Sequence, residues 1–260
     1  MDDLRRIREL YGEPEESPGA RDRVMARLEA APGRRRPRWT PVLASLAVAA
    51  VAAVAFAVPG RPADQGSDVL RAAASVTERQ PATKGAYWHI KRVINGTEVT
   101  ELWVARDGRA WVATRPKHGV PGAGGGKPVP FTGKGPFTMF GHELTLAQIE
   151  ALPRDPDTLR DEVERIVRDV PEKDRDGVVA DALSGLLWSK PAPPDVRAAA
   201  YRALAGLPGV RYLGNWTFSY EVRGEKRELT VSQADGQVIK AITGAMTEVV
   251  LEAEWTDEKP

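Results

Sequence analysis

The stretch GAYWHIKRVINGTEVTELWVA, residues 85–105, decides the fold class of this chain. Apolar and polar residues alternate along both of its halves, and Asn95-Gly96 lies between them. Such alternation is typical of strands with one buried face, and an Asn-Gly pair readily takes the positive φ angles of a type I′ turn. The stretch therefore predicts an antiparallel β-hairpin. Asp107-Gly108, followed by RAWVAT, predicts a third strand beside it.

Helical patterns flank these strands. Asp68 is expected to cap a helix with the sequence VLRAAASVTER, which ends before Pro81. Residues 115–141 are rich in Gly and Pro and predict a long loop. Between residues 144 and 207, apolar residues recur at helical spacing, and this pattern predicts three or four helices.

From residue 210 onward the sequence returns to strand patterns, with a turn at Asp235-Gly236. The expected strand segments are VRYLGNWTFSYEV (210–222), RELTVSQ (227–233), QVIKAIT (237–243) and MTEVVLEAEW (246–255). Strands, then helices, then strands predict an α+β domain over residues 68–260, with an antiparallel sheet and helices packed on one of its faces.

A second decisive stretch is PVLASLAVAAVAAVAFAV, residues 41–58, which has no charged side chain. As a helix it would be about 27 Å long, close to the hydrocarbon thickness of about 30 Å. We therefore expect one transmembrane helix over residues 39–59, preceding the α+β domain, with residues 60–67 as a linker. Its placement in the bilayer depends on an interfacial indole ring and on the larger apolar side chains: Trp39, Leu43, Leu46, Val51, Val54 and Phe56.

Basic residues before this stretch set its expected orientation. Arg34, Arg35, Arg36 and Arg38 precede it, so the positive-inside rule puts the N-terminus in the cytoplasm and the C-terminus outside the cell membrane. Two alternatives stay open. The stretch could be a signal peptide cleaved after Ala57, or a buried helix of a soluble protein.

Residues 1–38 form a basic tail with ten Arg against eight acidic residues and two short amphipathic helical patterns. Neither helix can bury its apolar stripe alone, so the tail would dock on a cytoplasmic protein, lie on the inner leaflet, or remain a solvated anchor. Anti-sigma factors have this topology. Their zinc-binding version needs His and Cys ligands that this tail lacks, so any sigma-factor binding would be zinc-free.

The composition gives little support to catalysis or nucleic-acid binding. The net charge is +1 and there is no Cys. The three histidines, His89, His118 and His142, have no metal-type spacing, and no Ser lies in a G-x-S-x-G turn. We therefore expect a non-enzymatic protein without catalytic residues, cofactor-binding residues or metal ligands. Five Trp lie in strand-like segments and would either fill the core or line a cleft for an apolar or carbohydrate ligand: Trp88, Trp103, Trp111, Trp216 and Trp255.

Several segments carry a resemblance to a known family. They are LRRIRELYGEPEESP (4–18), LPRDPDTLRDEV (152–163), RAAAYRALAGLPGVRYLG (197–214), QADGQVI (233–239) and VLEAEWTDEKP (250–260). On these segments and the Arg-flanked span, the chain resembles an actinobacterial family of single-pass membrane proteins with anti-sigma-like topology. The resemblance covers nearly the whole chain and implies a tail, a membrane helix and an external domain. It supplies no activity and no functional residue, and NWTFSYEVRGEK (215–226) departs from the family pattern.

The sequence leads us to expect one of two functions, which belong to different classes of protein. The first is a membrane-anchored, non-enzymatic envelope protein, most specifically a regulator whose tail binds a cytoplasmic partner. The second is an extracytoplasmic carrier of a lipid or another apolar ligand, since a curved sheet crossed by helices would resemble the half-barrel of lipoprotein carriers.

Overall fold

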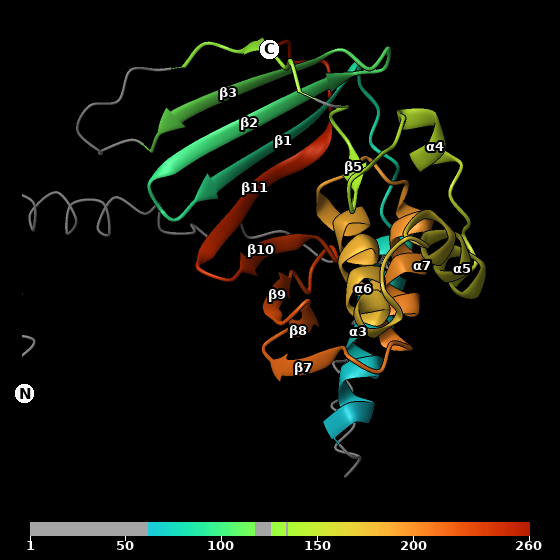
Figure 1. Ribbon diagram of the computed structural model, residues 1–260. Coiled ribbons are helices and arrows are strands. Elements are labelled where there is room, and N and C mark those ends of the chain that lie inside the picture. The colour runs from blue at the N-terminus through green and yellow to red at the C-terminus, as the bar shows by residue number, and fades with distance from the viewer. Residues whose placement is uncertain (1–61, 118–125, 134) are drawn as a thin grey trace, which may run out of the picture. The chain divides into compact units, whose positions relative to one another are not determined.

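The computed structural model describes residues 62–117, 126–133 and 135–260, which belong to one compact unit. They form an α+β fold with a large antiparallel sheet and a group of helices (Figure 1). The predicted transmembrane helix, the tail and the arginine cluster lie outside the described residues. Within the described ranges, no helix is long and apolar enough to cross a membrane.

The sheet follows the order β4-β3-β2-β1-β11-β10-β9-β8-β7. Its strands are β1 (Tyr87–Ile94), β2 (Glu98–Ala105), β3 (Ala110–Pro116), β4 (Val129–Pro130), β7 (Arg211–Gly214), β8 (Thr217–Val222), β9 (Glu225–Val231), β10 (Val238–Thr243) and β11 (Met246–Thr256). Two short strands, β5 (Thr138–Met139) and β6 (His142–Glu143), pair separately. The first strand along the chain, β1, therefore pairs with the last strand along the chain, β11.

The predicted hairpin is confirmed. Asn95 and Gly96 have φ angles of 48° and 74°, and the Thr97 N–H donates to the Ile94 carbonyl at 3.1 Å. These angles are those of a type I′ turn, which matches the twist of the flanking strands. Ile90 lies opposite Leu102 in this pair and Trp88 lies opposite Val104, so the alternation seen in the sequence sets the register.

One strand pair carries an extra residue that the sequence did not signal. Lys91 pairs with Glu252 but Arg92 pairs with Val250, so Leu251 has no partner on β1. Leu251 is 51% exposed, as expected for a bulged residue pushed out of the ladder. The bulge lies in the pair of β1 with β11, which joins the strands before the central helices to those after them, and a bulge increases the local twist.

The helices are α3 (Pro62–Glu78), α4 (Leu146–Glu150), α5 (Pro156–Ile166), α6 (Glu172–Trp188) and α7 (Pro194–Ala205). The four after residue 144 agree with the predicted helical region. The prediction that Asp68 caps the first helix is wrong, because α3 begins at Pro62 and includes residues expected to form the linker. Proline fits the first turn of a helix, and Asp68 instead pairs with Arg71 along the helix at 3.2 Å.

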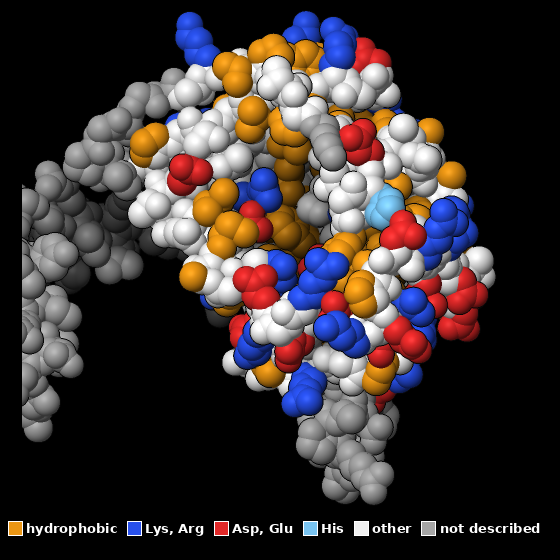
Figure 2. All heavy atoms as spheres, viewed as in Figure 1, with side chains coloured by type: hydrophobic (Ala, Val, Ile, Leu, Met, Phe, Trp, Pro, Cys, Tyr) orange, Lys and Arg blue, Asp and Glu red, His pale blue; other side chains and the backbone are white. Residues whose placement is uncertain are grey.

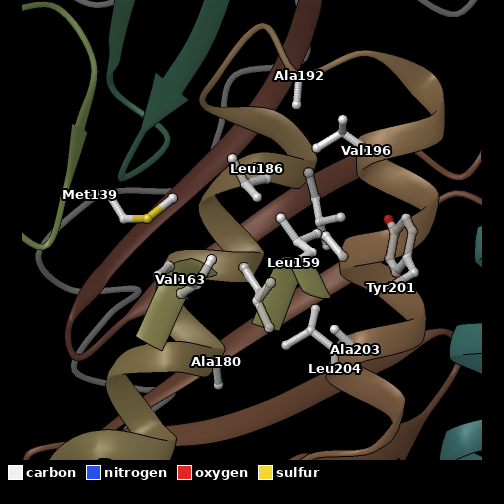
Figure 3. Packing of buried hydrophobic residues seen from close by; sticks show 14 of the residues in the cluster. Met139, Leu159, Val163, Ala180, Leu186, Ala192, Val196, Tyr201, Ala203 and Leu204 are labelled. Atoms are coloured by element: carbon white, nitrogen blue, oxygen red, sulfur yellow. The ribbon is translucent and has the colours of Figure 1, made fainter. Parts of the chain in front are cut away.

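The core lies between the sheet and the helices. Figure 3 shows side chains of α5, α6 and α7 meeting in it, among them Leu159, Leu186 and Val196, all fully buried. Trp88, Ile90 and Val104 join the same buried cluster from the sheet. Small residues of α7 let neighbouring elements come close, and they are also fully buried: Ala198, Ala199 and Ala200.

The segment predicted as one strand over residues 210–222 is two strands. Asn215 and Trp216 have φ angles of 49° and 57°, so the chain reverses there and β7 pairs with β8. Asn tolerates the left-handed region through its short polar side chain, and this residue type was the available turn signal. The expected long loop over residues 115–141 contains β4 and β5, each only two residues long.

Candidate functional site

At least three hollows in the described surface have the size of small-molecule sites, which start at about 300 Å³. One of about 520 Å³ lies between the start of α6 and β8. Two of its charged side chains pair with each other, Arg223 Nε with Asp174 Oδ2 at 3.6 Å. Another, of about 330 Å³, has polar groups without partners on its walls, and we call it the Trp88 cleft.

Aromatic and proline residues make up much of the Trp88 cleft. Trp88 on β1 and Trp255 on β11 pair across the two strands, with ring centroids 6.1 Å apart in an edge-to-face arrangement. Residues 191–194, which follow α6 and include the first residue of α7, also line the cleft. Rigid rings and prolines lose little conformational freedom when a ligand packs on them.

Arg106 fixes the outer wall of the cleft. Its guanidinium lies 4.0 Å from the centre of the Trp255 ring, a cation–π geometry. The same side chain donates to the Gly85 carbonyl at 3.1 Å and to Glu150 of α4 at 3.4 Å. Arg106 therefore has its own partners and holds Trp255 in place.

The turn between β9 and β10 forms a third wall of the cleft, and side chains of α3 and α7 donate hydrogen bonds to it. Gly236 has φ +69°, and its carbonyl accepts from the Tyr201 hydroxyl at 2.8 Å and from Thr77 Oγ1 at 3.4 Å. A Cβ on Gly236 would lie 2.2 Å from Thr77 Oγ1, so only glycine fits here. This contact puts Asp235 and Gln237 on the cleft wall.

Arg197 is the charged group that the cleft leaves without a partner. It lies in the first turn of α7 and is largely buried, and burial lowers the pKa of its guanidinium while Tyr201 and Asp235 nearby affect it less. Its Nε has no hydrogen-bond acceptor, and no described carboxylate forms an ion pair with it. The N-terminus of α7 has no side-chain cap, but Asp195 in its first turn accepts from the Val196 N–H at 2.9 Å and so offsets part of the positive end of the helix dipole.

Trp88 brings a second donor without an acceptor. The residue is 5% exposed, and its indole Nε1 has no hydrogen-bond partner in the described structure. A buried donor of this kind costs about 1–3 kcal/mol unless a partner satisfies it. A ligand with an acidic group near Arg197 and a flat apolar part against Trp88 and Trp255 would match these walls.

The Trp residues expected in strands have separate surroundings. Trp88 and Trp255 meet in the cleft, as the hypothesis of an aromatic cleft requires, whereas Trp111 packs against Tyr87 at 6.0 Å. Trp103 stacks on His89 with centroids 4.6 Å apart, and Trp216 lies in a turn.

His89 belongs to a buried charged cluster on β1, β2, β3 and β11. Its Nε2 lies 3.2 Å from Glu101 and its Nδ1 lies 3.4 Å from Glu252. Lys91 and Arg115 also pair with Glu101, so this carboxylate has three cationic or hydrogen-bonding neighbours. His142 is exposed and His118 lies outside the described residues. In the described part of the chain, no group of His, Asp and Glu is arranged to hold a metal ion.

The sequence did not identify Arg197, although it contained one signal. First turns of helices favour Asp and Glu because the dipole is positive there, and Arg197 opposes that preference. The predicted membrane and topology residues lie outside the described residues: Trp39, Leu43, Leu46, Val51, Val54, Phe56, Arg34, Arg35, Arg36 and Arg38.

Comparisons with protein-family models, with curated proteins and with solved structures gave no match to this chain.

Proposed function

We propose that residues 62–260 are a non-enzymatic binding domain for a small ligand that carries an acidic group and a flat apolar part. The observation that supports this most directly is the Arg197 guanidinium, largely buried and without a carboxylate partner, on the wall of the Trp88 cleft. Leaving a charge unpaired in a partly buried site is costly, so such a group is expected where a ligand completes the pairing.

Benzoate and the neutral analogue benzyl alcohol test the proposal in the full chain. Trp88 and Trp255 lie in the cleft, so intrinsic fluorescence reports binding directly. We expect benzoate to bind more tightly than benzyl alcohol, and Arg197→Gln to remove that preference. Arg168→Gln is the control, because Arg168 is exposed and outside the cleft. Equal binding of both probes to the wild-type chain would contradict the proposal.

We further propose that this domain is displayed outside the cell membrane by the apolar stretch 41–58, with the tail 1–38 in the cytoplasm. The support is the sequence: an uncharged stretch of 18 residues after an arginine cluster. Alkaline phosphatase fused after residue 67 should be active in intact cells, and the same enzyme fused after residue 38 should be inactive. The mass of the mature chain separates an anchor from a segment cleaved after Ala57.

The regulator function depends on the tail. A ligand-binding domain outside and an amphipathic tail inside are the two parts that a transmembrane sensor needs. A pull-down with the full chain from cytoplasmic extract should recover a sigma factor or another regulatory protein, and deletion of residues 1–38 should abolish the recovery. Recovery of the same proteins without the tail would contradict this role.

An apolar-ligand carrier is the second candidate, and the bend of the sheet around the helices favours it (Figure 1). Against it, buried side chains fill the space between sheet and helices, so an acyl chain would have to displace them. Solvent extraction of the purified chain followed by mass spectrometry tests this function. A lipid present in stoichiometric amount would favour the carrier over the acidic-ligand domain.

A further inference from the structure

A separate cleft of about 220 Å³ lies between α6 and strands β8–β11, and we call it the α6 cleft. Residues 138–140, including β5, form part of its rim. Figure 2 shows this side of the molecule hollowed between the sheet and the helices, with hydrophobic side chains in the hollow and charged ones beside them. The α6 cleft shares no lining residue with the Trp88 cleft.

Lys190 brings an ammonium group to this cleft. The residue is 7% exposed, and its side chain folds back over the last turn of α6. A Cβ at Gly185 would lie 2.6 Å from Lys190 Nζ, so the absence of a side chain at Gly185 provides the space that the ammonium occupies. The one hydrogen bond of Lys190 among the described residues is a long contact of 3.5 Å to Ser189 Oγ.

The carboxylates around the α6 cleft already have partners. Asp181 accepts from the Tyr220 hydroxyl at 3.2 Å, and Glu248 pairs with Arg92 at 2.8 Å. Glu228 pairs with a surface lysine at 2.7 Å. None of them forms an ion pair with Lys190 in the described structure. The lysine is therefore a buried positive charge without a counter-ion, although Asp181 is near enough to favour its charged form.

Ser184 adds a hydroxyl with no hydrogen-bond partner. It is 2% exposed, precedes Gly185 on α6 and lines the same cleft. Burial raises the pKa of the neighbouring Tyr220, and the Ser184 hydroxyl opposes this rise in small part, but its geometry satisfies no hydrogen bond to a described residue. Serines inside helices often donate to the carbonyl four residues back, and this one does not.

We propose that the α6 cleft binds a small oxyanion, a carboxylate or a phosphate, through the Lys190 ammonium and the Ser184 hydroxyl. An oxyanion accepts hydrogen bonds and carries the charge that the ammonium lacks, so it would satisfy both groups together. The site is independent of the acidic-ligand site at Arg197, because the two clefts have different walls.

Phosphate and acetate titrations of the full chain in detergent, followed by thermal unfolding at constant ionic strength, test the proposal. A ligand that binds only the folded state raises the melting temperature with concentration. We expect a rise with phosphate or acetate that is absent with chloride, and the two titrations show which class of oxyanion is preferred. Lys190→Met should weaken binding about tenfold or more, as for loss of a charged hydrogen bond.

Three further variants keep the result interpretable. Ser184→Ala should also weaken binding, so the proposal can be tested even where Lys190→Met perturbs folding. Lys173→Met changes an exposed lysine at the other end of α6 and should leave the oxyanion effect unchanged. Arg197→Gln should also leave it unchanged, which separates this site from the Trp88 cleft. An oxyanion effect equal to that of chloride, or one retained in both Lys190→Met and Ser184→Ala, would show that Lys190 serves only the C-terminal end of α6.

Discussion

Among the single residues that the structure describes, two basic side chains stand out because each loses solvent on folding and gains no carboxylate partner. Lys190 is buried and Arg197 is partly buried, both without a carboxylate ion pair, and they lie in different clefts. Desolvation disfavours the charged form of a base, so such groups reduce the stability of the unliganded fold. Both positions are therefore places where ligand affinity is gained at the expense of stability.

Lys190 should make stability depend on pH in a defined window. Burial lowers the pKa of its ammonium from 10.5 to about 8. Between those values the unfolded chain binds more protons than the folded chain, so stability should rise as the pH increases from about 8 to 10. Lys190→Met should remove this slope and stabilise the chain near neutral pH by up to about 3 kcal/mol. Urea unfolding near pH 7 and near pH 9.5 measures both effects.

Two buried tyrosines limit that window at its upper end. Burial raises the pKa of Tyr201 and of Tyr220 well above the usual value of 10. Above about pH 10 the unfolded phenols ionise while the folded ones stay neutral, so stability should fall again. The fall should be the same in Lys190→Met, and a variant that keeps the wild-type slope below pH 10 would contradict the assignment to Lys190.

Glu101 is the opposite case, a buried charge with many partners. It is 4% exposed and lies 3.2 Å from His89 Nε2, with Arg115 and Lys91 also beside it. Glu101→Leu should cost about 1–3 kcal/mol, because it leaves the buried His89 Nε2 without its hydrogen-bond partner and removes the carboxylate that the partly exposed Arg115 and Lys91 share. Glu98→Leu, at an exposed position of the same strand, is the control and should change stability by at most about 0.5 kcal/mol. Equal urea midpoints for the two variants would contradict this account.

At the element scale, the contact between α6 and β8 depends on a glycine. A Cβ at Gly177 would lie 2.1 Å from the Glu221 carbonyl oxygen, which is strand backbone and cannot move aside cheaply. Alanine would improve helix propensity by about 1 kcal/mol, but overpacking costs about 1–3 kcal/mol. We expect Gly177→Ala to destabilise the chain in urea unfolding, since the clash outweighs the propensity.

Gly206→Ala is the matched control for that contact. Gly206 follows α7, has φ −93°, and its added Cβ would meet the Ala203 carbonyl oxygen at an ordinary 3.5 Å. We expect a change within about 0.5 kcal/mol. If Gly177→Ala were equally neutral, α6 would not be held against β8 as closely as the structure has it.

The sequence predicted elements well where the signal is local. The Asn95-Gly96 turn and the helical stripe around Leu159 and Val163 both correspond to elements of the structure. The N-cap signal failed at the start of α3. Asp68 is a residue type that often caps a helix, but here it lies inside the helix and pairs with Arg71. Periodicity failed at Asn215-Trp216, where a bulky residue with positive φ occupies a tight turn.

The candidate sites were harder to predict than the elements. Trp88 and Trp255 were identified as possible cleft residues, but their pairing requires the first strand to lie beside the last. Arg197 and Lys190 are ordinary in sequence, and what marks them is the loss of solvent and partners on folding. That property depends on contacts between segments far apart in the chain, so local pattern does not contain it.

At the scale of the whole molecule, the sheet consists of two groups of strands from opposite ends of the described chain. Strands β1–β4 precede helices α4–α7 and β7–β10 follow them, and β11 joins the groups by pairing with both β1 and β10. The Trp88 cleft lies at this junction, since Trp88 belongs to β1 and Trp255 to β11. Both the Trp88 cleft and the continuity of the sheet therefore depend on β11.

Deletion of residues 246–260 should therefore abolish folding of the domain as one unit. Without β11 (Met246–Thr256), β1 and β10 each become an edge with unpaired backbone groups, and the core loses one side of its cover. Deletion of residues 258–260 alone is the control, because it keeps β11 and leaves Asp257 to accept from the Ala86 N–H at 3.0 Å. We expect the shorter deletion to unfold cooperatively in urea, as the wild-type chain does, and the longer one to show no cooperative transition. A cooperative transition after the longer deletion would mean that the two groups of strands fold independently, and the Trp88 cleft would then be an interface between two domains.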